Sequence, residues 1–169
     1  RDGLAGTFPL TEARIAAPTA PDVVVSMRWV MPEQQGSHPV SQIFREGFNQ
    51  NEQGMHATLG PTDLHNTGVA CGPDFRRGLT NSLPSGNVDV VPTLLWLMGI
   101  EPSAPLDGRV LSEALTVEGP PVHAAEPDRR EARVELSDGV WEQYLKFTEI
   151  NGVRYLDEGN GRWLPATAK

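Results

Sequence analysis

The chain has 169 residues, of which 38% are apolar, as is typical of a single domain of ordinary size. Its 22 acidic and 14 basic residues give a net charge of −8, which disfavours nucleic acid as the main partner because an acidic surface repels phosphate backbones. One cysteine, Cys71, excludes a disulfide within the chain. No apolar run is long enough to predict a membrane-spanning segment.

The N-terminal third of the sequence predicts little regular structure. Residues 1–20 combine small residues and prolines without periodicity, and we expect an arm or linker there. The β-branched run at residues 23–29 predicts a strand. A polar loop is expected over residues 31–54, and a second short strand over residues 67–71, where Gly-Pro follows.

Residues 87–99 carry the clearest helical pattern in the chain. Asn87 or Asp89 can cap its start, Pro92 is tolerated in its first turn, and Gly99 can end it. Apolar side chains recur at helical spacing on the side expected to face the core: Val91, Leu94, Leu95 and Met98. A turn and a short helical segment are predicted to follow, within residues 107–115.

The C-terminal region predicts an antiparallel meander. Residues 117–130 hold three prolines and several charges, which indicates a linker. A strand is expected over residues 141–150, a mirror-image turn at Asn151-Gly152, a returning strand over residues 153–156 and another turn at residues 159–161. Helical and strand patterns in this order predict an α/β core with a β appendage.

Two histidines are candidates for metal or proton chemistry. His56 stands in a loop of small residues that leaves its imidazole accessible, which suits a zinc ligand. His65 lies beside Asp63 and Asn66 and is a candidate second ligand or general acid. For both, composition alone favours a structural role. The sequence has no GxSxG, P-loop, HExxH or GxGxxG motif, so by itself it predicts no complete catalytic site.

Two segments resemble the alkaline phosphatase superfamily. From Asn87 to Leu111 the chain closely resembles a C-terminal signature shared by sulfatases and type I phosphodiesterases, in which an Asp-aliphatic-x-Pro-Thr helix ends in Gly-Ile and an Asp-Gly-Arg turn follows. Gly54-Met55-His56 and Gly72-Pro73-Asp74-Phe75 resemble the Gly-x-His-Gly loop and the Gly-Pro-x-Phe segment of the nucleotide pyrophosphatase/phosphodiesterase branch. Ala57 departs from the glycine usual in that loop.

The resemblance implies both a domain arrangement and a function. Residues 21–116 would form the C-terminal part of an alkaline-phosphatase-like core of sheet and helices. Residues 117–130 would be a linker, and residues 131–169 the β meander. His56 would bind one of two zinc ions that act on a small phosphate ester. The Thr or Ser nucleophile and the other ligands would precede this chain, which would supply no catalytic residue and would be inactive alone.

Two alternatives stay open. The helix signature also fits a sulfatase, with a formylglycine nucleophile and calcium, although the His56 loop favours phosphorus. A non-catalytic binding or assembly module is the other alternative, with its aromatic residues presented to a partner: Trp141, Tyr144, Tyr155 and Trp163. We favour a core role for these aromatics. A sheet that lacks its N-terminal strands has unpaired edges, so we also expect a homodimer or strand-swapped assembly.

Overall fold

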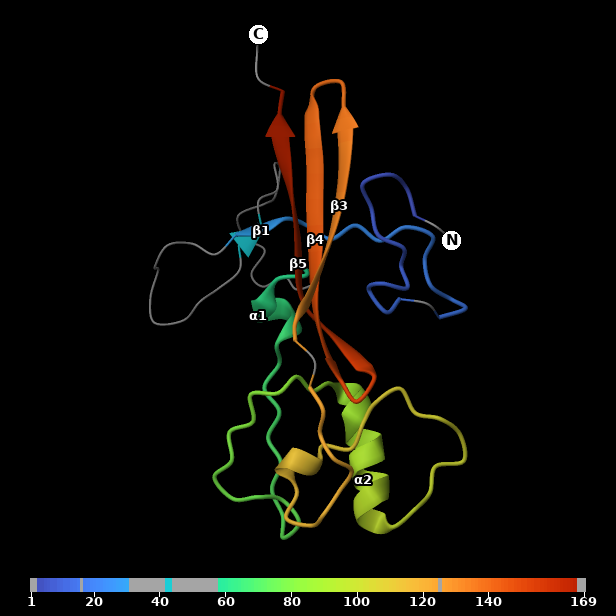
Figure 1. Ribbon diagram of the computed structural model, residues 1–169, viewed down its shortest axis with the longest axis vertical. Helices are drawn as coiled ribbons and strands as arrows, with labels where there is room; N and C mark the ends of the chain where they lie inside the picture. The colour runs from blue at the N-terminus through green and yellow to red at the C-terminus, as the bar shows by residue number, and fades with distance from the viewer. Residues whose placement is uncertain (1–2, 16, 31–41, 44–57, 125, 167–169) are drawn as a thin grey trace, which may run out of the picture. The chain divides into compact units, whose positions relative to one another are not determined.

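The computed structural model describes residues 3–15, 17–30, 42–43, 58–124 and 126–166, and of residues 42–43 the backbone only. Figure 1 shows the order of its elements along the chain. The chain divides into two units, which are described separately below. Unit 1 comprises residues 1–66, 129–146 and 156–169, and unit 2 comprises residues 67–128 and 147–155.

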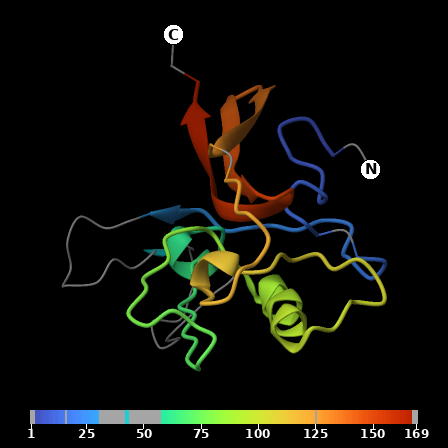
Figure 2. The same cartoon turned by 60° about the horizontal axis from the view of Figure 1, so that its bottom comes forward.

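Three long strands form the C-terminal sheet: β3 (Asp128–Leu136), β4 (Gly139–Ile150) and β5 (Val153–Pro165). They are antiparallel in the order β3-β4-β5 and lie side by side in both views (Figure 1 and Figure 2). Asn151 and Gly152 have φ angles of 51° and 80°, so the predicted mirror-image turn between β4 and β5 is confirmed. Strand β3 begins inside the segment predicted to be a linker.

The predicted turn at residues 159–161 is wrong, because β5 runs through it without interruption. The backbone N–H of Gly159 donates to the carbonyl of Leu59 at 2.7 Å. A Cβ on Gly161 would overlap the ring of Trp141. These glycines therefore allow a neighbouring backbone and an indole ring to approach the strand closely, and they do not reverse the chain.

The remaining elements of unit 1 are short. Strand β1 (Trp29–Val30) pairs antiparallel with β2 (Gln42–Ile43), Trp29 opposite Ile43, and α1 spans Pro61–Leu64. The strand predicted over residues 23–29 is reduced to β1 and a single parallel bridge between Met27 and Thr58. The valines before Met27 pair with no strand among the described residues and are exposed, and β-branched residues hold a strand only where a partner packs on them.

In unit 2 the predicted helix is confirmed as a 3₁₀ turn, η1 (Asn87–Asp89), followed by α2 (Val90–Met98). Gly99 ends α2 in the left-handed conformation, with φ 64°. The predicted helical turn near residue 112 is η2 (Ser112–Ala114). The strand predicted over residues 67–71 is wrong: this segment has no regular structure, and Val69 is 90% exposed.

The predicted core side of the helix is also wrong. Val91, Leu94 and Met98 are 53%, 48% and 67% exposed, Leu95 is half-buried, and the buried helix residues are Pro92 and Thr93. Unit 2 has its buried apolar residues elsewhere, at Leu115, Phe147 and Ile150. We call the exposed side of the helix the apolar face of α2: Val90, Val91, Leu94 and Met98.

The described residues thus combine strands and helices, as the predicted α/β class requires, but the sheet is antiparallel and the helices are few. An alkaline-phosphatase-like core is not shown by these residues, and it stays a prediction from the sequence. Across the same part of the chain, no helix has the length and apolar character needed to cross a membrane.

We expect Gly161→Ala to lower the free energy of unfolding by ~1–3 kcal/mol, because the added methyl group would overlap the Trp141 ring. Thermal or urea unfolding measures the change. Gly68→Ala is the matched control, since no atom lies within 4 Å of the Cβ position at Gly68. Equal stability of the Gly161→Ala variant and the original chain would contradict the close packing of Trp141 on β5.

Candidate functional site

Of the two predicted histidines, the structure describes His65. His56 lies outside the described residues. His65 is exposed and follows α1, where its backbone N–H donates to the Pro61 carbonyl at 2.8 Å. In the described ranges no group of three or more His, Cys, Asp or Glu residues is placed to hold a metal ion. Zinc binding by His56 and His65 therefore remains a prediction.

The segment that carries the family resemblance is built around a buried carboxylate. Asp89 is 0% exposed and accepts hydrogen bonds from the backbone N–H groups of Gly86 and Arg109, each at 2.8 Å. The Tyr155 hydroxyl lies 3.0 Å from both carboxylate oxygens. A buried carboxylate is costly unless it accepts such bonds. These donors therefore fix both the start of the helix and the turn that contains Arg109.

Thr93 and Gly108 complete the connection between the helix and the turn. The Thr93 hydroxyl donates to the Asp89 carbonyl at 2.7 Å and accepts from the Leu111 N–H at 3.0 Å. A Cβ on Gly108 would overlap the Val88 carbonyl. We call this set the Asp89 clamp: Asp89, Thr93, Gly108, Arg109 and Tyr155. Each member has a residue type that its position requires.

The Arg109 side chain, 4% exposed, extends the clamp. Its guanidinium donates to both oxygens of Glu113, at 2.7 and 2.8 Å, and to the Tyr155 hydroxyl at 3.1 Å. Burial opposes the charge of Arg109, but its contacts with Glu113 and Tyr155 outweigh burial and raise the pKa of Arg109. Burial likewise opposes the charge of Glu113, and its hydrogen bonds, those from Arg109 first, lower the pKa of Glu113. Arg109 and Glu113 therefore both stay charged at neutral pH, and their ion pair stabilises the local fold.

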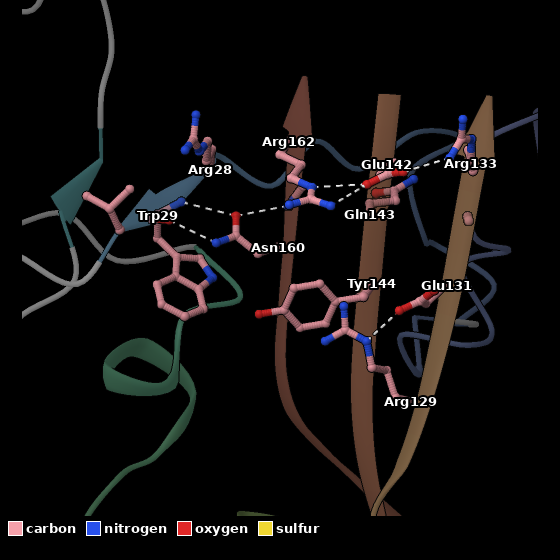
Figure 3. Close-up of a pocket in the computed structure, with 13 residues that line it drawn as sticks. Arg28, Trp29, Arg129, Glu131, Arg133, Glu142, Gln143, Tyr144, Asn160 and Arg162 are labelled. Carbon is pink, nitrogen blue, oxygen red and sulfur yellow. Dashed lines mark hydrogen bonds and ion pairs between the residues drawn. The ribbon is translucent and has the colours of Figure 1, made fainter. Parts of the chain in front are cut away.

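A pocket of about 690 Å³ lies in unit 1, on one face of the C-terminal sheet (Figure 3). Its volume is within the usual range for small-molecule sites. Residues of β3, β4 and β5 line it together with the segment 28–30: Arg28, Trp29, Val30, Arg129, Glu131, Ala132, Arg133, Glu142, Gln143, Tyr144, Asn160, Gly161 and Arg162. We call it the sheet pocket.

One wall of the sheet pocket is held by Trp29 and Asn160. The Trp29 indole N–H donates to the Gly159 carbonyl at 2.6 Å. The Asn160 side chain donates to the Trp29 carbonyl at 2.8 Å and accepts from the Trp29 N–H at 3.4 Å. Trp29 is 8% exposed. These bonds attach the segment before β2 to β5 and give the pocket a fixed edge.

The other polar groups of the sheet pocket are mostly paired. Glu142 accepts from Arg133 at 3.0 Å and from Arg162 at 2.8 Å. Arg129 pairs with Glu131 at 2.7 Å, and its guanidinium lies 3.8 Å from the centre of the Tyr144 ring. The sequence analysis missed this site. Alternating charges along residues 128–136 were the only sign of it in the sequence, and only the sheet brings them into one pocket with residues of β4 and β5.

No protein-family model, curated protein or solved structure matches the chain. The alkaline phosphatase superfamily therefore stays a resemblance in the sequence.

The Tyr155 hydroxyl gives a spectroscopic test of the Asp89 clamp. Burial, followed by the negative charge of Asp89, raises the pKa of Tyr155 from 10.0 to about 12. The neutral phenol therefore stabilises the fold fully below pH 10, and this stabilisation is lost as the pH rises towards about 12. We expect Tyr155→Phe to cost ~1–3 kcal/mol at pH 7, because Asp89 loses a buried donor, and to flatten the loss of stability between pH 10 and pH 12.

The chain has two tyrosines, so absorbance at alkaline pH resolves them. Tyr155→Phe should remove the component that ionises near pH 12, whereas Tyr144→Phe should retain it. If both tyrosines of the original chain ionise near pH 10, the clamp is not formed as described.

Proposed function

We propose that the chain is the C-terminal part of a metal-dependent phosphoric ester hydrolase of the phosphodiesterase/nucleotide pyrophosphatase type, to which it contributes His56 as a metal ligand. The observation that carries the proposal is the near-continuous resemblance from Asn87 to Leu111 together with the physical role of that segment. Asp89, Thr93, Gly108 and Arg109 are signature residues, and all four belong to the Asp89 clamp. The resemblance therefore falls on positions where the local fold requires the residue type.

The apolar face of α2 gives further support. Helix α2 has the sequence VVPTLLWLM and carries no charged residue. A helix that is apolar on all sides is typical of the interior of a larger protein. In the proposed hydrolase this face would pack against the rest of the core, which would explain why large apolar side chains such as Leu94 and Met98 are exposed here.

In this proposal His56 would hold zinc through a neutral imidazole nitrogen, and the Asp89 clamp would fix the local fold of the signature segment. Two zinc ions would stabilise the attacking and leaving oxygens of a phosphate ester. A sulfatase of the same superfamily is the competing proposal, and the His56 loop favours phosphorus over sulfur.

The test uses the natural gene product, whose mass is first compared with the 18.4 kDa of this chain. We expect a larger polypeptide that hydrolyses a phosphodiester, loses activity to a chelator and regains it with zinc. His56→Ala should reduce bound zinc and lower activity by two or more orders of magnitude, because a metal ligand is lost. His123→Ala is the matched control, since the His123 side chain is exposed and its backbone N–H makes the bond to Asn151.

A product of 18.4 kDa that neither binds zinc nor hydrolyses phosphodiesters would remove the hydrolase proposal and favour a binding module. Hydrolysis of a sulfate ester in preference to a phosphodiester would favour the sulfatase alternative.

The apolar face of α2 also leads to a prediction for this chain when it is studied by itself. We expect self-association at high concentration, and the double variant Leu94→Gln, Met98→Gln should reduce it while leaving the melting temperature within about 2 °C, because both side chains are already exposed. Light scattering and thermal unfolding measure the two effects. A large fall in melting temperature would show that this face is buried within the monomer.

A further inference from the structure

We infer that the sheet pocket of unit 1 binds a small molecule carrying at least two negative charges on oxyanion groups, such as carboxylates or phosphates. This inference does not rest on the proposed hydrolase function, because none of the described residues that line the pocket belongs to the segments that carry the family resemblance.

The first argument is the charge of the pocket. Among the residues that the structure describes, four arginines line it, Arg28, Arg129, Arg133 and Arg162, against two glutamates, Glu131 and Glu142. This described part of the lining has a net charge of 4 − 2 = +2, in a chain whose net charge is −8. A concave cationic surface on an acidic protein attracts anions locally, while the rest of the surface repels them.

The second argument is that the described residues of the pocket do not neutralise two of these positive charges. Arg133 and Arg162 share the single carboxylate of Glu142, which leaves one surplus charge. Arg133 also approaches Glu135 at 3.4 Å, but Glu135 does not line the pocket and its side chain is 78% exposed, so solvent screens that pair. Arg28 is exposed and has no hydrogen bond or ion pair to any residue that the structure describes. The surplus matches a ligand with two negative charges.

The third argument is the fixed geometry of the guanidinium groups. Arg162 is held to Glu142 by two of its nitrogens, Nε and Nη2, at 3.0 and 2.8 Å. Arg129 is stacked on Tyr144, whose own hydroxyl donates to Glu158 at 3.1 Å. Guanidinium groups restrained in this way lose little entropy when they bind a second oxyanion, and their planar forks suit carboxylate and phosphate groups.

The size of the pocket decides between a bare ion and an organic ligand. About 690 Å³ is far more than one tetrahedral ion fills, and the lining arginines come from separate segments of the unit. Two charged groups on one molecule would therefore contact Arg28 and the Arg133–Arg162 pair together. Pyrophosphate and citrate are suitable probes, because both carry several charges and differ in the chemistry of their oxyanions.

The test is isothermal titration of the whole chain with pyrophosphate, with citrate and with acetate, after a chelating resin has removed metal ions so that no metal site contributes and no free chelator competes. We expect saturable one-to-one binding of at least one multivalent probe, with no saturation by acetate. Raising the salt concentration from 0.05 M to 0.5 M should weaken binding several-fold, because the charges are partly exposed and are screened by salt. Preference for pyrophosphate or for citrate would identify the natural ligand as a phosphate or a carboxylate compound.

Variants locate the bound probe. Arg28→Gln and Arg162→Gln should each weaken binding about tenfold, since each removes charged hydrogen-bond donors. Arg77→Gln makes the same change in charge at an exposed position outside the pocket lining and should leave affinity within twofold. Thermal unfolding of each variant reports whether it folds as the original chain does.

Three results would overturn the inference. They are the absence of saturable binding by either multivalent probe, unchanged affinity in both folded pocket variants, and an equal loss of affinity in Arg77→Gln.

Discussion

Unit 2 depends on one buried carboxylate. Among the described residues, Asp89 has no cationic side chain as its hydrogen-bond partner; its carboxylate accepts hydrogen bonds from two backbone N–H groups and a tyrosine hydroxyl. Desolvating a carboxylate costs several kcal/mol unless such donors replace water. For the charge to be accommodated, three segments must therefore come together: the start of the helix, the turn at Arg109 and the part of β5 that contains Tyr155. This requirement makes the local fold specific.

The hydrogen bonds of the Asp89 clamp also show which of two roles, catalytic or structural, the signature residues have. An Asp and a Thr at a helix start, followed by Gly-Arg, could mark a catalytic site or a structural one. Here the Asp89 carboxylate and the Thr93 hydroxyl are satisfied by neighbouring groups of the fold, and Gly108 is required because the Val88 carbonyl fills the space of a side chain. The signature residues thus serve the local architecture, and in the proposed hydrolase the chemistry would depend on residues such as His56.

The C-terminal sheet uses its two faces differently. On one face, glycines of β5 receive the Trp141 ring and the side chain of Leu145, which gives the sheet a packed surface. On the other, charged residues alternate along the strands and form the sheet pocket around Tyr144. Strand periodicity of two residues produces this division, and the hairpin turn at Asn151-Gly152 sets which residues of β4 and β5 are neighbours.

The sequence by itself determined the elements whose causes are local: the helix that ends at Gly99, where glycine adopts a left-handed conformation, and the hairpin turn that Asn151-Gly152 favours. The sequence misassigned residues 23–29, 67–71 and 159–161. A run of valines forms a strand only where a partner strand is present. A pair of glycines can mark a close contact with a neighbouring segment as well as a turn. Only the tertiary structure decided which side of α2 is buried, that Tyr155 reaches Asp89 across 66 residues, and that Arg28 joins the arginines of β3 and β5. These are contacts between distant segments, and neither periodicity nor propensity carries information about them.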